Sequence, residues 1–149
     1  MRLTAFTDVC LRVLMHLAAR DGERMTAQQL AEEIGVPYHH VTKAVVELRS
    51  RGALDVARGR TGGACITEAG LDASVGALVR SLTPRTEMVD CDGTESGTPC
   101  PLRGQCRLRT ALARAREAFF ASLDPLRVRD LIPGGAGPAF LGLPAFPPA

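Results

Sequence analysis

The chain has 149 residues, of which 46% are hydrophobic and 23% are charged, and its net charge is +2. These values are typical of a globular protein with one compact domain, and no apolar run has the length of a membrane-spanning helix. The opening sequence MRLTAFTDVCLR carries Asp8 and Arg12 where a secretory signal peptide has an apolar stretch. We therefore expect a cytoplasmic protein that has no membrane partner.

Helical periodicity with short polar breaks covers residues 1–82. Thr26 and Gln29 have the spacing of a capping box, which places a helix start there. The three predicted helices run from about Thr4 to Arg20, from Thr26 to Gly35 and from Pro37 to Gly52. Their expected buried faces are Phe6, Cys10, Val13, Leu14 and Leu17, then Ala27, Leu30, Ala31 and Ile34, then Val41, Val45 and Leu48.

The second and third helices are separated by a short turn that contains glycine, which is the pattern of a helix-turn-helix. Short strands are predicted at Leu54–Val56 and Cys65–Thr67, on either side of the basic sequence RGRTGG at 58–63. A basic hairpin directly after a recognition helix is a wing. The predicted fold class is therefore mainly α with a small β wing, a winged helix-turn-helix followed by a C-terminal dimerisation helix.

Polar and basic side chains occupy the exposed positions of the third helix and the wing. The first residues of a recognition helix reach base edges in the major groove, while basic groups meet phosphates, and arginines enter narrow minor grooves. The alternative is a solvated charged surface on a small helical domain. The predicted contacts to double-stranded DNA are His39, His40, Thr42, Lys43 and Arg49 on the helix and Arg58 and Arg60 on the wing.

An apolar stripe marks a later helix, because Leu108, Leu112, Ala115, Phe119 and Leu123 follow one another at spacings of four, three, four and four. The stripe either folds back on the N-terminal domain or pairs with a second copy of the chain. Pairing with a second copy gives a symmetric homodimer, which reads a pseudo-palindromic operator.

Five cysteines without a secretory signal indicate metal binding, redox chemistry or plain structural thiols rather than disulfides. Cys10 and Cys65 fall in regular elements and are expected to be core residues. Cys91, Cys100 and Cys106 lie in a segment rich in glycine and proline, with eight residues in the first gap and five in the second. These gaps lack the paired C-x₂₋₄-C pattern of structural zinc and favour an iron–sulfur cluster.

A 4Fe–4S cluster needs a fourth ligand, and no histidine lies near the third cysteine on its C-terminal side. The residues alone leave that ligand open between distant sequence, another subunit and a small molecule. Protein candidates are Asp8, Cys10, His16 and Cys65. The structural alternative for Asp8 is a carboxylate in the first turn of a helix, paired with Arg12 one turn later.

Six segments together resemble the NsrR group of nitric-oxide-sensing repressors, within the IscR-like superfamily of iron–sulfur winged-helix regulators. They are MRLTAFTD..LR at 1–12, GVPYHHVTKAV at 35–45, ARGRTGG at 57–63, VDC…PCPLRGQCRLR…AL at 89–112, FFASLDPL at 119–126 and RDL at 129–131. The resemblance implies a homodimer in which Cys91, Cys100 and Cys106 hold the cluster and Asp8 of the partner subunit supplies the fourth ligand. It also implies that nitric oxide attacks the cluster, weakens operator binding and derepresses nitric-oxide detoxification genes.

The first cysteine gap departs from the NsrR pattern, which has five residues in both gaps. The additional residues fall in the stretch DGTESGTP, which is expected to loop out. A 4Fe–4S cluster is the expected cofactor, and a 2Fe–2S cluster is the alternative, in which case the protein responds to redox or iron–sulfur status. A small iron–sulfur enzyme or electron carrier is disfavoured, because no catalytic constellation is present and a carrier has no use for a winged helix.

Four regions follow from these patterns. They are a DNA-binding winged helix-turn-helix at 1–82, a cluster-binding loop at 83–106, a dimerisation helix with a short following helix at 107–132 and a Pro/Gly-rich tail at 133–149.

Overall fold

The structure is a computed structural model that describes residues 3–20, 22–83 and 88–132, so the predicted tail lies outside the described residues. Its elements are α1 (Ala5–Ala18), α2 (Ala27–Ile34), α3 (Tyr38–Ser50), β1 (Leu54–Ala57), β2 (Gly63–Ile66), α4 (Glu68–Leu71), α5 (Val75–Leu82), η1 (Arg103–Gln105), α6 (Arg107–Leu123) and η2 (Val128–Leu131). The predicted fold class, mainly helical with a two-stranded antiparallel wing, is confirmed. Among the described residues, no helix combines the length and apolarity needed to span a bilayer.

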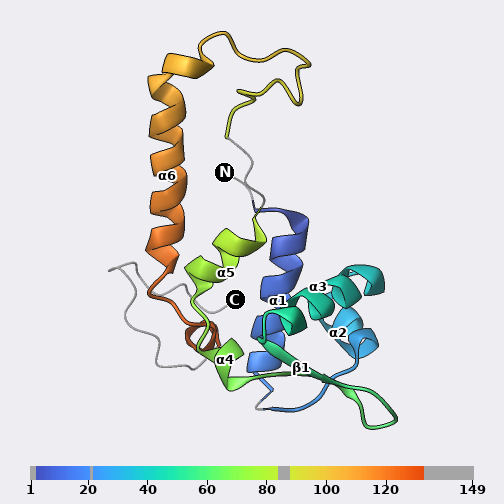
Figure 1. Cartoon of the computed structure of the whole chain (residues 1–149). Helices are drawn as coiled ribbons and strands as arrows, with labels where there is room; N and C mark the ends of the chain where they lie inside the picture. Colours follow the sequence, from blue (N-terminus) through green and yellow to red (C-terminus); the bar gives the residue numbers. More distant parts are fainter. Residues whose placement is uncertain (1–2, 21, 84–87, 133–149) are drawn as a thin grey trace.

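Helix α1 is the centre of a reading head that consists of α1 to α5 and the wing (Figure 1). Its predicted apolar face is buried, with Phe6 half-covered at one end. The capping box predicted at Thr26 and Gln29 is present, with the Thr26 hydroxyl accepting from the Gln29 amide and the Gln29 side chain accepting from the Thr26 amide. Because α2 and α3 pack on α1 through the faces that periodicity predicts, the sequence determines the head locally.

The wing is a hairpin in which Leu54 stands opposite Ile66 and Ala57 opposite Gly63. Strand β2 begins at Gly63, two residues before the predicted position, although glycine has no side chain that could mark a strand. The strand is longer because its second residue, Ala64, forms backbone hydrogen bonds with Met25, which is distant in the sequence. The amide of Met25 donates to the Ala64 carbonyl at 2.9 Å, and the amide of Ala64 donates back at 2.8 Å, so this short bridge extends the pairing.

Helix α6 extends away from the head, and the segment 88–106, here called the cysteine loop, lies at its far end (Figure 1). The helix has 17 residues, which corresponds to a length of about 25 Å. Beyond α6 the chain returns to the head, because the Val75 amide donates to Leu126 and the Val128 amide donates to Ala73, at 2.9 and 3.1 Å. Val128 is fully buried, so backbone hydrogen bonds and the burial of this side chain together hold the segment after α6 against the head.

Candidate DNA interface and cysteine loop

The start of α3 and the tip of the wing form one candidate surface for DNA. His39, His40, Lys43 and Arg49 are exposed, as predicted, and the two imidazole rings lie 4.0 Å apart. Thr42 is half-buried, and its hydroxyl donates to the His39 carbonyl at 3.0 Å, so this side chain is engaged with its own helix. That these side chains contact DNA stays a prediction.

The wing places two exposed arginines, Arg58 and Arg60, in the connection between β1 and β2. Arg24, which sequence patterns did not single out, anchors this hairpin by donating to the Gly63 carbonyl at 3.1 Å and pairing with Asp55 of β1. The hydrogen bond from Arg24 lowers the pKa of Asp55 below its usual range. No periodicity joins residues 31 positions apart, so only the structure reveals this anchor.

Helix α3 also exposes two large side chains that the sequence analysis passed over. Tyr38 is the first residue of α3, beside the two histidines, and is 53% exposed. Val46 is 68% exposed and lines a shallow hollow with Phe6 and Lys43. Counting outward-facing positions along the whole helix would have found both.

The eight-residue gap between Cys91 and Cys100 closes into a loop. The amide of Cys100 donates to the carbonyl of Cys91 at 3.1 Å, which brings the two backbones together. Inside the loop, the Asp90 carboxylate accepts from the amides of Glu95 and Ser96 at 3.2 and 2.7 Å. Hydrogen bonding by the Ser96 side chain and by these amides lowers the pKa of Asp90 to about 2. The additional residues thus loop out, as the sequence predicts.

Gly93 is needed for this closure. Its φ of +71° lies in the left-handed region, and a Cβ there would sit 2.3 Å from the Thr98 carbonyl carbon. The start of the gap, just after Cys91, is joined to η1 by an ion pair between Asp92 and Arg103 at 2.5 Å.

Cys106 occupies the N-cap of α6, and its Sγ accepts a hydrogen bond from the Arg109 amide at 3.4 Å. Thiolate is the form of cysteine that binds metal. Burial raises the pKa of Cys10 to about 11 and keeps that thiol protonated within the core. Cys65 is half-buried on β2, so the prediction that both are packing residues agrees with their positions.

The three thiols of the cysteine loop are the right type of ligand for an iron–sulfur cluster, since such clusters are usually held by cysteine thiolates. Within the described part of the single chain, however, no three His, Cys, Asp or Glu side chains are gathered closely enough to hold a metal ion. Asp8 lies apart from the cysteine loop on α1 and pairs with Arg12 at 3.0 Å. The donor chemistry therefore fits the cluster, while ligation by Asp8 stays a prediction that needs a second subunit.

The stripe predicted on α6 is largely open to solvent. Leu108 is 60% exposed and Phe119 is 38% exposed, whereas their neighbour Phe120 is buried against α5. The helix therefore packs on the head through Phe120 and, at its last turn, Leu123, and leaves Leu108, Ala115 and Phe119 of the stripe exposed in the single chain.

Residues 3–134 match the Rrf2 family, described as an iron-dependent transcriptional regulator. The chain is 52% identical over 145 residues to the HTH-type transcriptional repressor NsrR of Streptomyces coelicolor, which covers 96% of each chain. It is 37% identical to the HTH-type transcriptional regulator NsrR of Geobacillus kaustophilus, over 89% of this chain and 90% of that one. These relatives confirm the resemblance noted from the sequence.

Solved structures agree on the fold. IscR of T. potens superposes with a TM-score of 0.65 at 16% identity, over 88% of this chain and 85% of that one. The oxidized form of CymR from Staphylococcus aureus gives 0.61 at 22% identity, over 87% and 94%. The chain therefore belongs to the Rrf2 family and is a DNA-binding transcriptional regulator, not an enzyme.

Proposed function

We propose that the chain is a homodimeric transcriptional repressor, acting on DNA in the cytoplasm, that senses nitric oxide through an iron–sulfur cluster. Cys91, Cys100 and Cys106 hold the cluster, expected to be 4Fe–4S, and Asp8 of the partner subunit completes it. Nitric oxide weakens binding to a pseudo-palindromic operator and derepresses nitric-oxide detoxification genes. The observation that carries this proposal is the closed cysteine loop at the far end of α6, in a chain 52% identical to a repressor named NsrR.

A bound cluster would supply iron with which nitric oxide reacts. The contacts of α1 connect the position of Asp8 with the candidate DNA surface on α3. Next to Asp8, the fully buried Thr7 hydroxyl donates to the Leu82 carbonyl at the end of α5, at 3.2 Å. Beyond it, α1 packs along α3. Loss of a bond between Asp8 and a bound cluster would therefore act on the helix against which α3 packs.

The first experiment is native mass spectrometry of anaerobically purified protein, followed by titration with nitric oxide and operator-binding assays. A dimer with one 4Fe–4S mass increment per chain, which loses operator affinity with nitric oxide and not with reversible redox cycling, supports the proposal. A bare or zinc-loaded dimer contradicts the sensor function and leaves the DNA-binding function standing.

The longer first cysteine gap favours one second candidate, a regulator with a 2Fe–2S cluster that responds to redox or iron–sulfur status. It predicts a 2Fe–2S mass increment and operator affinity that follows the oxidation state. The same mass spectrum therefore separates the two candidates.

Asp8→Ala tests the ligand from the partner subunit. We expect it to shorten the lifetime of the cluster on the order of tenfold and to change its reaction with nitric oxide, because a carboxylate ligand is lost. Cluster absorption and nitric-oxide stopped-flow traces measure both. Arg12→Ala is the matched control, since it breaks the same ion pair and keeps the carboxylate. An Asp8→Ala protein with an unchanged spectrum and unchanged reaction would rule out ligation by Asp8.

Replacing Arg58 and Arg60 together by alanine tests the wing. Two lost phosphate or minor-groove contacts are expected to lower operator affinity by about tenfold and to flatten the slope of log affinity against log salt by one to two. Fluorescence anisotropy at several salt concentrations measures both quantities. Arg129→Ala on η2 removes an exposed arginine outside α3 and the wing and should leave the slope unchanged. Equal slopes for all three proteins would show that the wing does not touch DNA.

A further inference from the structure

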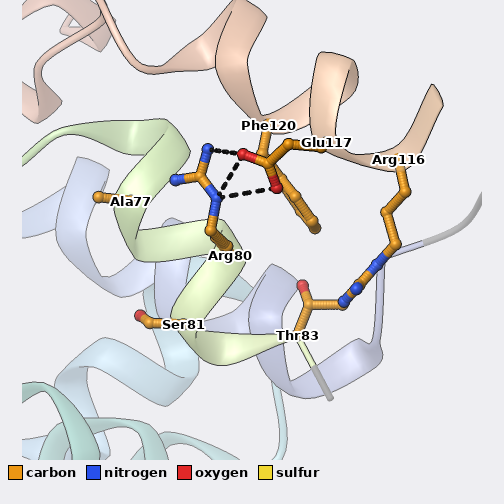
Figure 2. Close-up of a pocket in the computed structure, with 7 residues that line it drawn as sticks. All are labelled: Ala77, Arg80, Ser81, Thr83, Arg116, Glu117 and Phe120. Carbon is orange, nitrogen blue, oxygen red and sulfur yellow. Dashed lines mark hydrogen bonds and ion pairs between the residues drawn. The ribbon is translucent and has the colours of Figure 1, made fainter. Parts of the chain in front are cut away.

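Arg80 of α5 holds α6 through two carboxylates. Its guanidinium donates to Glu117 at 2.8 Å and makes paired hydrogen bonds to Asp124 at 3.0 and 3.1 Å. Figure 2 shows the Arg80 side chain meeting Glu117 where α5 and α6 cross. The hydrogen bond from Arg80 lowers the pKa of Asp124, so this carboxylate stays charged near neutral pH. We call this arrangement the Arg80 clamp.

The clamp lies around the most deeply packed part of α6. Of the residues of α6, all of which the structure describes, Phe120 alone is buried. Its ring lies between two guanidinium groups, with Arg80 at 5.4 Å and Arg116 at 5.1 Å from the ring centre, within the range of cation–π attraction. Toward the cysteine loop, α5 and α6 part around a hollow of about 690 Å³ that Thr83 and Arg116 line (Figure 2).

Gly76 fixes how closely the two helices approach. A Cβ at this position would lie 2.5 Å from the Phe120 carbonyl oxygen and 2.6 Å from the Asp124 amide nitrogen. Beside it, the Ser74 hydroxyl donates to the Asp124 carbonyl at 3.0 Å. Gly76 and Ser74 thus set the distance at the base of the joint, which leaves the tilt of α6 to Phe120 and the Arg80 clamp.

We propose that the Arg80 clamp sets the angle between α6 and the reading head, and thereby the spacing of operator half-sites that the dimer accepts. The inference rests on the proposed function, because it requires α6 to pair two chains on DNA. Helix α6 acts as a lever of about 25 Å, so a tilt of about 10° displaces its far end by about 4 Å. One base pair advances about 3.4 Å along DNA and turns the second half-site by about 35°, so this tilt matches the axial part of a change of one base pair in spacing.

The test uses full-length holoprotein and an operator selected with the unaltered protein from random-sequence duplexes. Affinity is measured for that operator and for versions with one base pair added or removed between the half-sites. We expect the unaltered protein to lose about tenfold in affinity on either change. Arg80→Ala should lose only about twofold, because its reading heads can change their angle to α6 and so fit the altered spacing. The spacing penalty is a ratio, so a loss of folded protein alone does not move it.

Matched variants complete the test. Arg129→Ala also removes an arginine with two acidic partners, Glu68 and Asp72, and should keep the full penalty. Arg80→Lys, which keeps the charge without the two-carboxylate geometry, should give an intermediate penalty. Should Arg80→Ala fail to fold, Glu117→Gln removes one exposed partner and should still reduce the penalty. If Arg80→Ala and Glu117→Gln both keep the full spacing penalty, the inference about the clamp is wrong and the proposed function still stands. If the unaltered protein is monomeric or selects no DNA, the inference and the proposed function are both wrong.

Discussion

Cys100→Ser is expected to lower the iron content of anaerobically purified protein by at least about tenfold, because one of three thiolates from the same loop is lost. The backbone bond from Cys100 to Cys91 remains in this variant, so the loop itself should still close. Operator binding should then no longer respond to nitric oxide. Iron analysis, cluster absorption and operator binding with and without nitric oxide measure these outcomes.

Cys65→Ser is the matched control, since Cys65 is also a half-buried thiol but lies on β2 in the wing. It should retain iron and the response to nitric oxide. Iron loading that survives in Cys100→Ser, or that falls equally in Cys65→Ser, would contradict the assignment of the cysteine loop as the ligand set.

Phe120→Ala is expected to destabilise each chain by about 3–5 kcal/mol, the usual cost of deleting a buried phenylalanine. The ring is 1% exposed and packs with Val75 and Val79 of α5, so its loss opens the joint between α6 and the head. Thermal and denaturant unfolding at several protein concentrations measure the change. The loss should be similar at all concentrations, because Phe120 packs within its own chain.

Phe119→Ala is the complementary variant at the next position. Its ring is partly exposed on the stripe of α6, so its removal should cost the isolated chain little and weaken the dimer. Its effect should therefore grow as the protein is diluted, since dimer stability depends on concentration. Sedimentation equilibrium gives the dimer constant directly. A Phe119→Ala dimer as tight as the unaltered one would remove the stripe from the proposed interface.

Local sequence was sufficient for most of the head and for the irregular course of the cysteine loop. The faces of α1, α2 and α3 follow from a period of 3.6, and Thr26 with Gln29 predicts a helix start from spacing alone. The location of Cys91, Cys100 and Cys106 outside regular helices follows from the prolines and glycines around them. Each of these features depends on side chains that are only a few positions apart in the sequence.

Contacts between segments that are distant in the sequence could be identified only from the folded structure. Periodicity marks Phe119 as part of an apolar stripe, yet the buried ring is Phe120, because α5 approaches α6 from the side that Gly76 leaves open. The same holds for the anchor of the wing by Arg24 and for the two carboxylates that meet Arg80, which no spacing rule pairs. By itself, the sequence determined α1 to α3 with their buried faces, the wing hairpin, α6 and the irregular loop that carries three cysteines. The tertiary structure decided how α6 is held against the head, because ion pairs and ring packing between remote segments depend on how closely two backbones approach.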